Sequence, residues 1–281
     1  MSLSYQNNCY KETVLIRRHR ILIFDSGLGG ISVYHEIRKI LPDVHYFYVF
    51  DNVDFPYGNK EDKFLIQRAE KIISEISNKY LLDMVVIACN TVSTVALSSL
   101  RAQFKFPIVG VVPAIKRAAE LTRNGIIGLL ATPTTISQSY THELIAKFAS
   151  KYTTLMFGSL ELVTLAENKL QNIPISIDKL QNILKTWLIK DQHPDIIVLG
   201  CTHFQFLTEE LYQIFPRVIK ILDSSVAVAR QIDLLLKHIP LQKIIKGTNT
   251  AFCIDFTNNS QQKFLVLQRY GFKILEPLLL K

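Results

Sequence analysis

The sequence predicts an α/β protein built from two similar units, and three observations support this prediction. Short apolar, β-branched runs alternate with longer segments of helical periodicity for most of the 281 residues. A segment that ends in a cysteine and two polar residues occurs once in each half of the chain. The composition, with 48% hydrophobic and 20% charged residues, is that of a folded protein with a sizeable core.

The expected strands are short and lack a polar alternation, which is typical of parallel strands with helices on both faces. Between two of them, residues 60–80 carry apolar side chains at helical spacing, with charged residues in between. The expected strands comprise residues 20–24, 45–50, 84–88, 108–112, 126–131, 153–156, 196–200 and 218–222.

The internal repeat joins residues 83–91 (DMVVIACNT) to residues 195–203 (DIIVLGCTH), which match position for position. Each copy has an acidic start, an apolar strand, a small residue, a cysteine and two polar residues. Apolar residues at helical spacing follow both copies, and then a Phe-Pro pair and another apolar run. The repeat therefore predicts two α/β units of the same design.

The net charge of +8 raises the question of nucleic-acid binding, because Lys and Arg neutralise phosphates. However, the 32 basic residues are spread along the chain among 24 acidic ones, without an aromatic-interleaved basic stripe. We therefore expect a moderately basic surface that attracts small anions, with nucleic-acid binding as a less favoured alternative.

The chain contains no apolar run long enough to span a bilayer, and its first 20 residues are polar, with no apolar core of a signal peptide. Four cysteines are too few and too far apart for a disulfide framework or a zinc knuckle. We therefore expect a cytoplasmic protein with reduced thiols. Cys9 and Cys253 lack any motif and are interpreted as small apolar residues.

Three reactive side chains are expected at the carboxyl ends of strands, where open parallel sheets bind their ligands. Cys89 and Cys201 follow matched strands of the two repeats, and Asp25 follows the first strand. A helix N-terminus stabilises a thiolate, so we expect a lowered pKa for the two cysteines.

Several chemistries use two thiols or a thiol and a histidine. A dithiol redox couple needs a C-x-x-C spacing, which is absent. A cysteine hydrolase needs one thiolate and one histidine, and His203 is available for either cysteine. Neither explains the duplication, whereas stereoinversion by two bases does, because one thiolate removes a proton from a carbon and the other thiol returns one to its opposite face.

The glycine-rich residues 24–30 (FDSGLGG) resemble a dinucleotide-binding loop only partly. Ser32 occupies the place of the third glycine, and the charge of Asp25 opposes a pyrophosphate. A tight turn that presents Asp25 and Ser26 to the ligand explains this segment better than nucleotide binding does.

Four motifs in this order and spacing resemble the glutamate racemases of the aspartate/glutamate racemase superfamily. They comprise residues 24–30, 56–58 (PYG), 88–91 (ACNT) and 199–203 (LGCTH). The resemblance covers about residues 20–275. Further stretches, residues 50–58, 110–116 and 139–145, are similar to the enterobacterial branch.

The resemblance implies a cofactor-independent interconversion of L- and D-glutamate, which supplies D-glutamate for peptidoglycan, without a metal ion. It also implies two open parallel-sheet, flavodoxin-like domains related by a pseudo-two-fold axis, with the active site at their interface. We expect a discontinuous first domain, residues 1–113 plus 224–281, and a second domain, residues 114–223.

The resemblance also assigns roles to individual residues. Cys89 is the expected base for D-glutamate and Cys201 the expected base for L-glutamate, while Asp25 and His203 assist the thiols. Glu167 matches a further acidic residue of the family's site. Substrate contacts are expected at Asp25, Ser26, Tyr57, Gly58, Asn90, Thr91, Thr132, Thr135, Thr202 and His203.

The enterobacterial branch depends on an activator, UDP-N-acetylmuramoyl-L-alanine, which we expect here as a ligand beside glutamate. Aspartate or another acidic amino acid is an alternative substrate, and the sequence leaves monomer and homodimer open. The chain departs from the family at Gln205, where a proline is usual, and we expect a change in local rigidity more than in chemistry.

Overall fold

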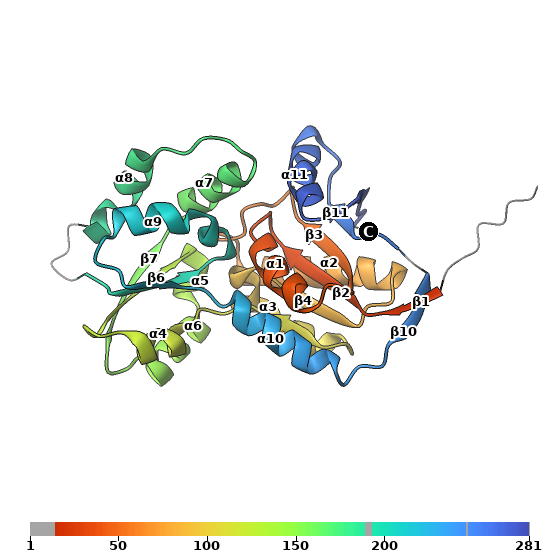
Figure 1. Cartoon of the computed structure of the whole chain (residues 1–281), viewed down its shortest axis with the longest axis horizontal. Helices are drawn as coiled ribbons and strands as arrows, with labels where there is room; N and C mark the ends of the chain where they lie inside the picture. Colours follow the sequence, from red (N-terminus) through yellow and green to blue (C-terminus); the bar gives the residue numbers. More distant parts are fainter. Residues whose placement is uncertain (1–14, 189–192, 246, 281) are drawn as a thin grey trace, which may run out of the picture.

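The computed structural model describes residues 15–188, 193–245 and 247–280. These residues form two lobes, each with a central parallel sheet covered by helices (Figure 1). A small antiparallel pair, β1 (Leu15–Arg18) with β10 (Gln242–Ile245), lies at the edge of the first lobe. The described residues thus form the α/β architecture that the sequence predicts.

The first sheet has six parallel strands. Their spatial order is β12 (Ile274–Pro277), β11 (Thr250–Cys253), β3 (His45–Phe50), β2 (Arg20–Asp25), β4 (Met84–Ile87) and β5 (Ile108–Gly110). Its helices are α1 (Ile31–Ile40), α2 (Asp62–Lys79), α3 (Asn90–Gln103), α10 (Ser225–Leu236) and α11 (Asn258–Arg269). The strands β11 and β12 show that the C-terminal segment returns to the sheet of the first lobe, whereas the exact boundaries of the domains remain a prediction.

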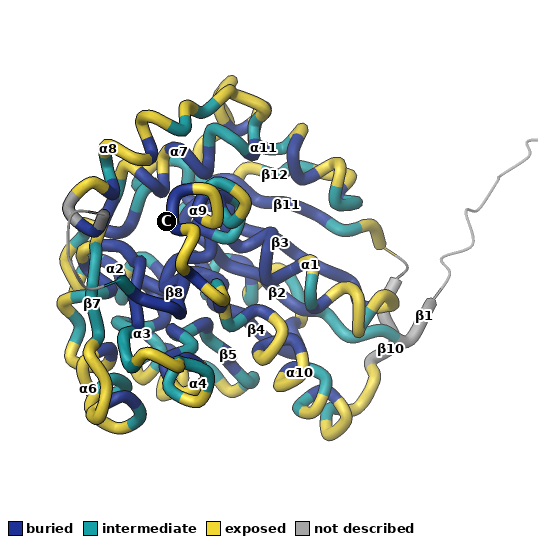
Figure 2. Tube along the Cα trace, turned by 60° about the vertical axis from the view of Figure 1, so that its left-hand side comes forward, coloured by how far each residue is buried: buried dark blue, intermediate teal, exposed yellow. Residues whose placement is uncertain are grey.

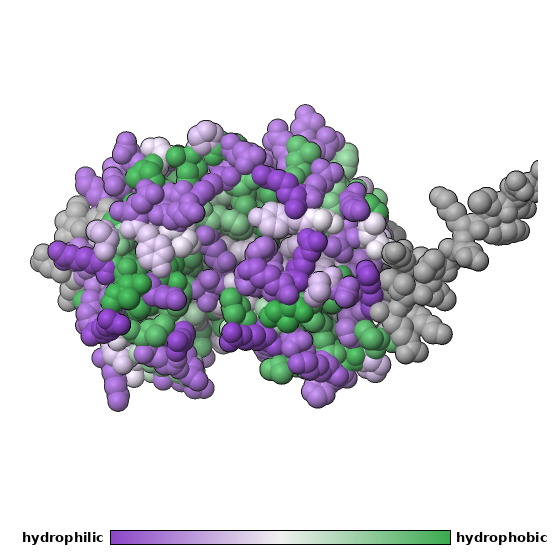
Figure 3. Space-filling model, in the orientation of Figure 1, coloured by the Kyte–Doolittle hydropathy of each residue, from purple (hydrophilic) through white to green (hydrophobic). Residues whose placement is uncertain are grey.

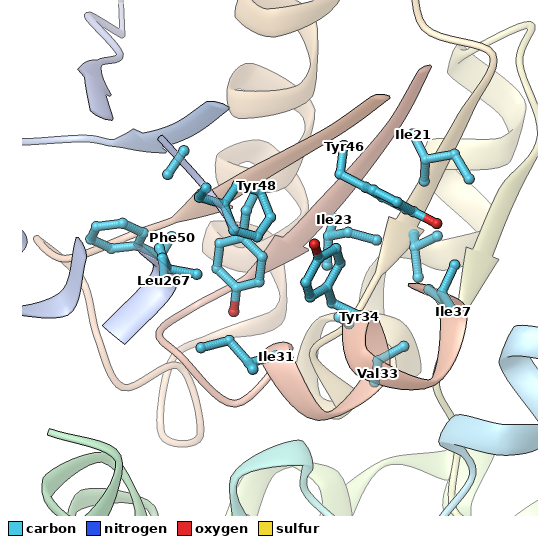
Figure 4. Packing of buried hydrophobic residues seen from close by; sticks show 14 of the residues in the cluster. Ile21, Ile23, Ile31, Val33, Tyr34, Ile37, Tyr46, Tyr48, Phe50 and Leu267 are labelled. Atoms are coloured by element: carbon cyan, nitrogen blue, oxygen red, sulfur yellow. The ribbon is translucent and has the colours of Figure 1, made fainter. Parts of the chain in front are cut away.

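Strand β2 illustrates how the first core forms, because its successive side chains point to opposite faces of the sheet. Ile21 and Ile23 join the apolar cluster beneath α1 and α10, and Leu22 and Phe24 join the cluster beneath α2 and α3. Figure 4 shows the first cluster, in which several large aromatic side chains fill the space between the strands and α1. Burial on both faces explains why the strand sequences are apolar throughout.

The second sheet has four parallel strands in the order β7 (Thr153–Gly158), β6 (Ile126–Ala131), β8 (Ile196–Gly200) and β9 (Lys220–Leu222). Its helices are α4 (Ile115–Leu121), α5 (Pro133–Ser137), α6 (Ser139–Phe148), α7 (Glu161–Leu170), α8 (Ile177–Leu188) and α9 (Thr208–Ile214), with a 3₁₀ helix η1 (Thr202–Leu207) before α9.

The two sheets share one strand order, since β3-β2-β4-β5 of the first corresponds to β7-β6-β8-β9 of the second. The repeated sequence segments form β4 and β8, which occupy equivalent places. In each sheet the strand order reverses beside that strand, between β2 and β4 and between β6 and β8. Ligand sites of open α/β sheets lie at such reversals, so both cysteines lie where a ligand site is expected.

All eight strands predicted from the sequence are present, with ends that differ by at most two residues. The structure adds four strands that were not predicted: β1, β10, β11 and β12. A helix begins after Cys201, as predicted, and its first part is the 3₁₀ helix η1, which leads into α9. The expectation for Cys9 falls outside the described residues.

Burial follows the layers, with buried central strands and helices exposed on their outer faces (Figure 2). The face drawn in Figure 3 is mainly hydrophilic, with apolar residues in small scattered groups. Across the described ranges, no helix is both long enough and apolar enough to cross a membrane.

Candidate active site

A small, partly enclosed cavity lies where the carboxyl ends of the two sheets face each other. Its volume is about 10 Å³, which is room for about one water molecule. The lining residues come from both lobes and comprise Ser26, Pro56, Tyr57, Gly58, Cys89, Asn90, Thr91, Thr132, Val163, Cys201, Thr202 and His203. Ten of the expected site residues are in this set, so residues far apart in the sequence meet here.

Cys89 forms the wall of the cavity on the side of the first sheet, as the residue directly before α3. It is 6% exposed. Burial and the neighbouring charge of Asp25 raise the pKa of this thiol far above its ordinary value, against smaller opposing effects of the Val92 N–H and the Ser26 hydroxyl. The expected lowering of the pKa by the helix is therefore wrong for Cys89, because desolvation outweighs the helix N-terminus.

Asp25 lies beneath Cys89, at the end of β2, and its side chain is fully buried. One carboxyl oxygen accepts a hydrogen bond from the Gly27 N–H at 2.7 Å, and the other accepts one from the Thr202 hydroxyl at 3.1 Å. Burial raises the pKa of Asp25 despite the nearby charge of His203. This carboxyl group therefore has a raised affinity for a proton next to Cys89.

Cys201 forms the opposite wall, after β8 of the second sheet. Its Sγ lies 3.9 Å from Nδ1 of His203, within the range of a hydrogen bond to sulfur. Burial alone would lower the pKa of His203. The hydrogen bonds to Cys201 and Glu167, with the charge of Asp25, raise this pKa well above its ordinary value instead. The resulting imidazolium is placed to stabilise a thiolate on Cys201.

Glu167 lies behind His203 and does not line the cavity. Its Oε2 accepts hydrogen bonds from Nε2 of His203 at 2.8 Å and from the Leu28 N–H at 3.0 Å, and Oε1 contacts Nζ of Lys263 at 2.5 Å. Burial would raise the pKa of Glu167, but the charge of Lys263 and the bond to His203 lower it to about 2. An ionised Glu167 accepts a hydrogen bond from the Nε2–H of His203. This contact orients the ring so that Nδ1 faces the Cys201 thiol.

Hydroxyl groups from both lobes form a chain beside the thiols. The Thr91 Oγ1 lies 3.0 Å from the Thr132 Oγ1, which in turn lies 2.9 Å from the Thr135 Oγ1. Thr135 thus supports Thr132 from behind the cavity. The side-chain amide nitrogen of Asn90 is buried and has no hydrogen-bond partner among the described residues, although the residue lines the cavity. Such a donor suits an anionic ligand.

The turn that carries Tyr57 is anchored by a buried ion pair. The Tyr57 hydroxyl donates a hydrogen bond to Asp51 at 2.6 Å, and the Arg68 guanidinium donates two to the same carboxylate, at 2.6 and 3.0 Å. The side chain of Asp51 is fully buried. This network fixes the position of residues 56–58 against the cavity.

Sequence reasoning did not identify Asp51 and Arg68 as parts of the site, nor Lys263. Asp51 lies in the stretch 50–58 that is similar to the enterobacterial branch, but it was assigned no role. No motif marks Arg68 or Lys263, because each meets the site only through the folded chain. The remaining expected residues, Asp25, Glu167 and Thr135, lie directly behind cavity residues. Cys253 is buried in β11, as expected for an apolar role. Within the described ranges, no cluster of three or more His, Cys, Asp and Glu side chains is suited to a metal ion.

Gln205 lies in η1, on the side of this helix away from the cavity. Its carbonyl accepts a hydrogen bond from the Thr208 hydroxyl at 2.7 Å. With Phe206, Arg269 and Tyr270 it lines a groove of about 640 Å³ between α7, η1 and α11. The departure from proline therefore does not change the lining of the cavity.

A family model for Asp/Glu/Hydantoin racemase matches residues 21–232, which include both cysteine motifs. The chain belongs to the Asp/Glu/Hydantoin racemase family. The glutamate racemase of Escherichia fergusonii is 52% identical over 270 residues, 96% of this chain and 95% of that protein. The glutamate racemase of Erwinia tasmaniensis is 51% identical over 94% of both chains.

The structure of this chain is also similar to solved structures of racemases. Escherichia coli glutamate racemase, in complex with L-glutamate and the activator UDP-MurNAc-Ala, matches with a TM-score of 0.90 at 51% identity, over 94% of this chain and 99% of that chain. The glutamate racemase of Aquifex pyrophilus matches with a TM-score of 0.69 at 28% identity, over 92% of this chain and all of that chain. This racemase-family chain is thus an isomerase with the two-lobed fold of its relatives.

Proposed function

We propose that this chain racemises glutamate by a two-base mechanism that needs no cofactor. The observation that carries the proposal is the placement of two thiols, Cys89 and Cys201, at matched strand ends on opposite walls of one cavity. Two bases on opposite sides of a carbon atom can invert its configuration, because one removes a proton and the other supplies one.

The surroundings of the thiols suit them to different roles. For L-glutamate, a Cys201 thiolate stabilised by the His203 imidazolium removes the α-proton, and Cys89, held as a thiol by burial, donates its proton to the opposite face of the carbanion. Asp25 is placed beside Cys89 to return a proton to it. For D-glutamate the same steps run in reverse, with Cys89 as the base.

The carbanion requires stabilisation, because an α-proton of an amino acid is only weakly acidic. The hydroxyl groups of Thr91 and Thr132 and the unpartnered amide of Asn90 face the cavity and can bind the α-carboxylate as negative charge develops. These donors act in a small, largely buried cavity with room for about one water molecule, where electrostatic interactions are strong.

Glutamate needs far more room than a cavity that holds about one water molecule. The walls must therefore separate to admit the substrate and close around it for the reaction. Because the walls come from different lobes, we propose that a relative movement of the lobes opens the site.

The identity to glutamate racemases, 51–52% over nearly the whole chain, supports glutamate over aspartate as substrate. We also propose that the enzyme supplies D-glutamate for peptidoglycan in the cytoplasm. The Escherichia coli structure contains UDP-MurNAc-Ala as activator, and we propose the same compound as an activator of this chain.

Proton NMR in D₂O tests the function, with purified protein, reducing agent and EDTA, with and without the muramoyl precursor. We expect the α-proton signal of L-glutamate to disappear while chiral analysis shows D-glutamate, faster when the precursor is present. Exchange of the α-proton of aspartate but not of glutamate would show that aspartate is the substrate. No exchange with either amino acid would contradict the proposal.

A further inference from the structure

Lys263 is a buried cation that no motif predicts and that the proposed chemistry does not use directly. It lies on α11 of the first lobe and is 3% exposed. Its Nζ contacts the Glu167 Oε1 at 2.5 Å and lies 4.3 Å from the centre of the Phe55 ring, which packs in turn against His203. A lysine this deeply buried is rare unless a nearby group compensates its charge.

The contacts of Glu167 divide between its two oxygens. Oε1 binds Lys263 from α11, while Oε2 binds His203 and the Leu28 N–H. With Oε1 occupied, the carboxylate cannot rotate to offer its other oxygen to His203. The ring of His203 is therefore held with Nδ1 toward the Cys201 Sγ, at 3.9 Å.

We propose that Lys263 is a positioning residue of the racemase site: its ammonium fixes the Glu167 carboxylate, which in turn orients His203 toward Cys201. The inference rests on the proposed function. Because α11 belongs to the first lobe, whereas Glu167 and His203 belong to the second, this arrangement is complete only when the lobes are closed. Lys263 thus couples closure of the lobes to the orientation of His203, and so to the activity of Cys201 as the base for L-glutamate.

The charge of Lys263 also acts on proton binding in the site. The titratable group in direct contact with it is Glu167 from α7, whose pKa the charge of Lys263 lowers. Behind Glu167 lies His203 of η1, which in turn feels the charge of Asp25 at the end of β2. Removal of a positive charge raises the pKa of each group that it faces. Because the active state needs one thiolate, the acidic limb of the activity profile moves to higher pH when Lys263 is lost.

The test compares Lys263→Met, Lys263→Arg and the exposed control Lys273→Met with the wild type. We expect Lys263→Met to lower kcat/KM about tenfold or more and to move the acidic limb of its pH profile upward. Lys263→Arg keeps the charge and should keep that limb near its original pH. Lys273→Met should match the wild type in rate and profile.

A second readout does not depend on racemisation. The rate at which iodoacetamide alkylates Cys201, followed by mass spectrometry of the Cys201 peptide, reports its thiolate as a function of pH. We expect the midpoint to rise in Lys263→Met and not in Lys263→Arg. An unchanged midpoint and pH profile in a folded Lys263→Met protein would overturn the role of Lys263. A wild type inactive on glutamate would instead overturn the proposed function, while the alkylation data would still decide the role of Lys263.

Discussion

The main chain at Gly29 lies directly against the imidazole ring of His203. A methyl group added at Gly29 would lie 2.3 Å from Nδ1 of that ring, far inside van der Waals contact. The two residues belong to different lobes, so the close approach of the glycine-rich turn to the second lobe requires a residue without a side chain. At this position, glycine is needed for its small size and not for its backbone conformation.

We therefore expect Gly29→Ala to lower kcat/KM by about 100-fold, because displacement of a reacting group by about 1 Å has an effect of this order. Steady-state kinetics with both enantiomers measures the change, and circular dichroism checks the fold. Gly110→Ala is the control, since the atoms nearest to its new methyl group belong to the Leu97 side chain, which does not line the cavity. Equal rates for Gly29→Ala and the wild type would show that the ring of His203 can move without loss.

The assignment of the two thiols predicts a different partial reaction for each serine variant. Cys201→Ser should lose racemisation but still exchange the α-proton of D-glutamate slowly with solvent, because Cys89 remains. Cys89→Ser should likewise lose racemisation but still exchange the α-proton of L-glutamate slowly with solvent, because Cys201 remains. Proton NMR in D₂O with each enantiomer measures the exchange, and an equal loss of both exchanges in both variants would contradict the assigned sides.

Sequence patterns predict the parts of this molecule that depend on local information. The buried strands are continuous apolar runs, and the duplicated cysteine motif marks β4 and β8, whose places in the two sheets are equivalent. Strands β11 and β12 have four residues each and gain their stability from neighbours in a sheet formed by distant segments. A pattern this short does not distinguish a strand from a loop.

The site shows the same division between local and long-range information. The motifs identify most cavity residues, because the thiols and their polar neighbours are adjacent in sequence. Lys263 meets Glu167 across 96 positions of the chain, and no sequence spacing records this contact. The pKa of the Cys89 thiol was predicted in the wrong direction, because the sequence shows the helix start but not the depth of burial.

The ion pair of Arg68 with Asp51 predicts a large effect on stability. Loss of Arg68 leaves a buried carboxylate without its cation, so we expect Arg68→Leu to lower the free energy of unfolding by about 3–5 kcal/mol. Urea unfolding followed by circular dichroism measures the change. The control Arg117→Leu removes an arginine whose ion pair with Glu120 is exposed, and it should change stability little. Similar effects of both variants would show that the buried pair contributes no more than a surface pair.

The lowered pKa of Glu167 predicts how stability depends on pH. Its value is about 2 in the folded protein, against 4.5 for an ordinary glutamate, so the unfolded chain binds this proton first as pH falls. The stabilisation is fully present above about pH 4.5 and is lost progressively as pH falls toward 2, on the order of 3 kcal/mol in all. The raised pKa of Asp25 has the opposite effect, because it makes the folded protein more stable as pH falls. This effect is present in both the wild type and the variant.

The difference between the wild type and Glu167→Gln isolates this contribution. Unfolding in urea, followed by the fluorescence of the single tryptophan, Trp187 in the second lobe, gives the free energy of both proteins at pH 5.5 and pH 3. The wild type should be the more stable protein at pH 5.5, and it should lose more stability than the variant on acidification. Parallel losses in the two proteins would mean that Glu167 does not keep its charge through the contacts with Lys263 and His203.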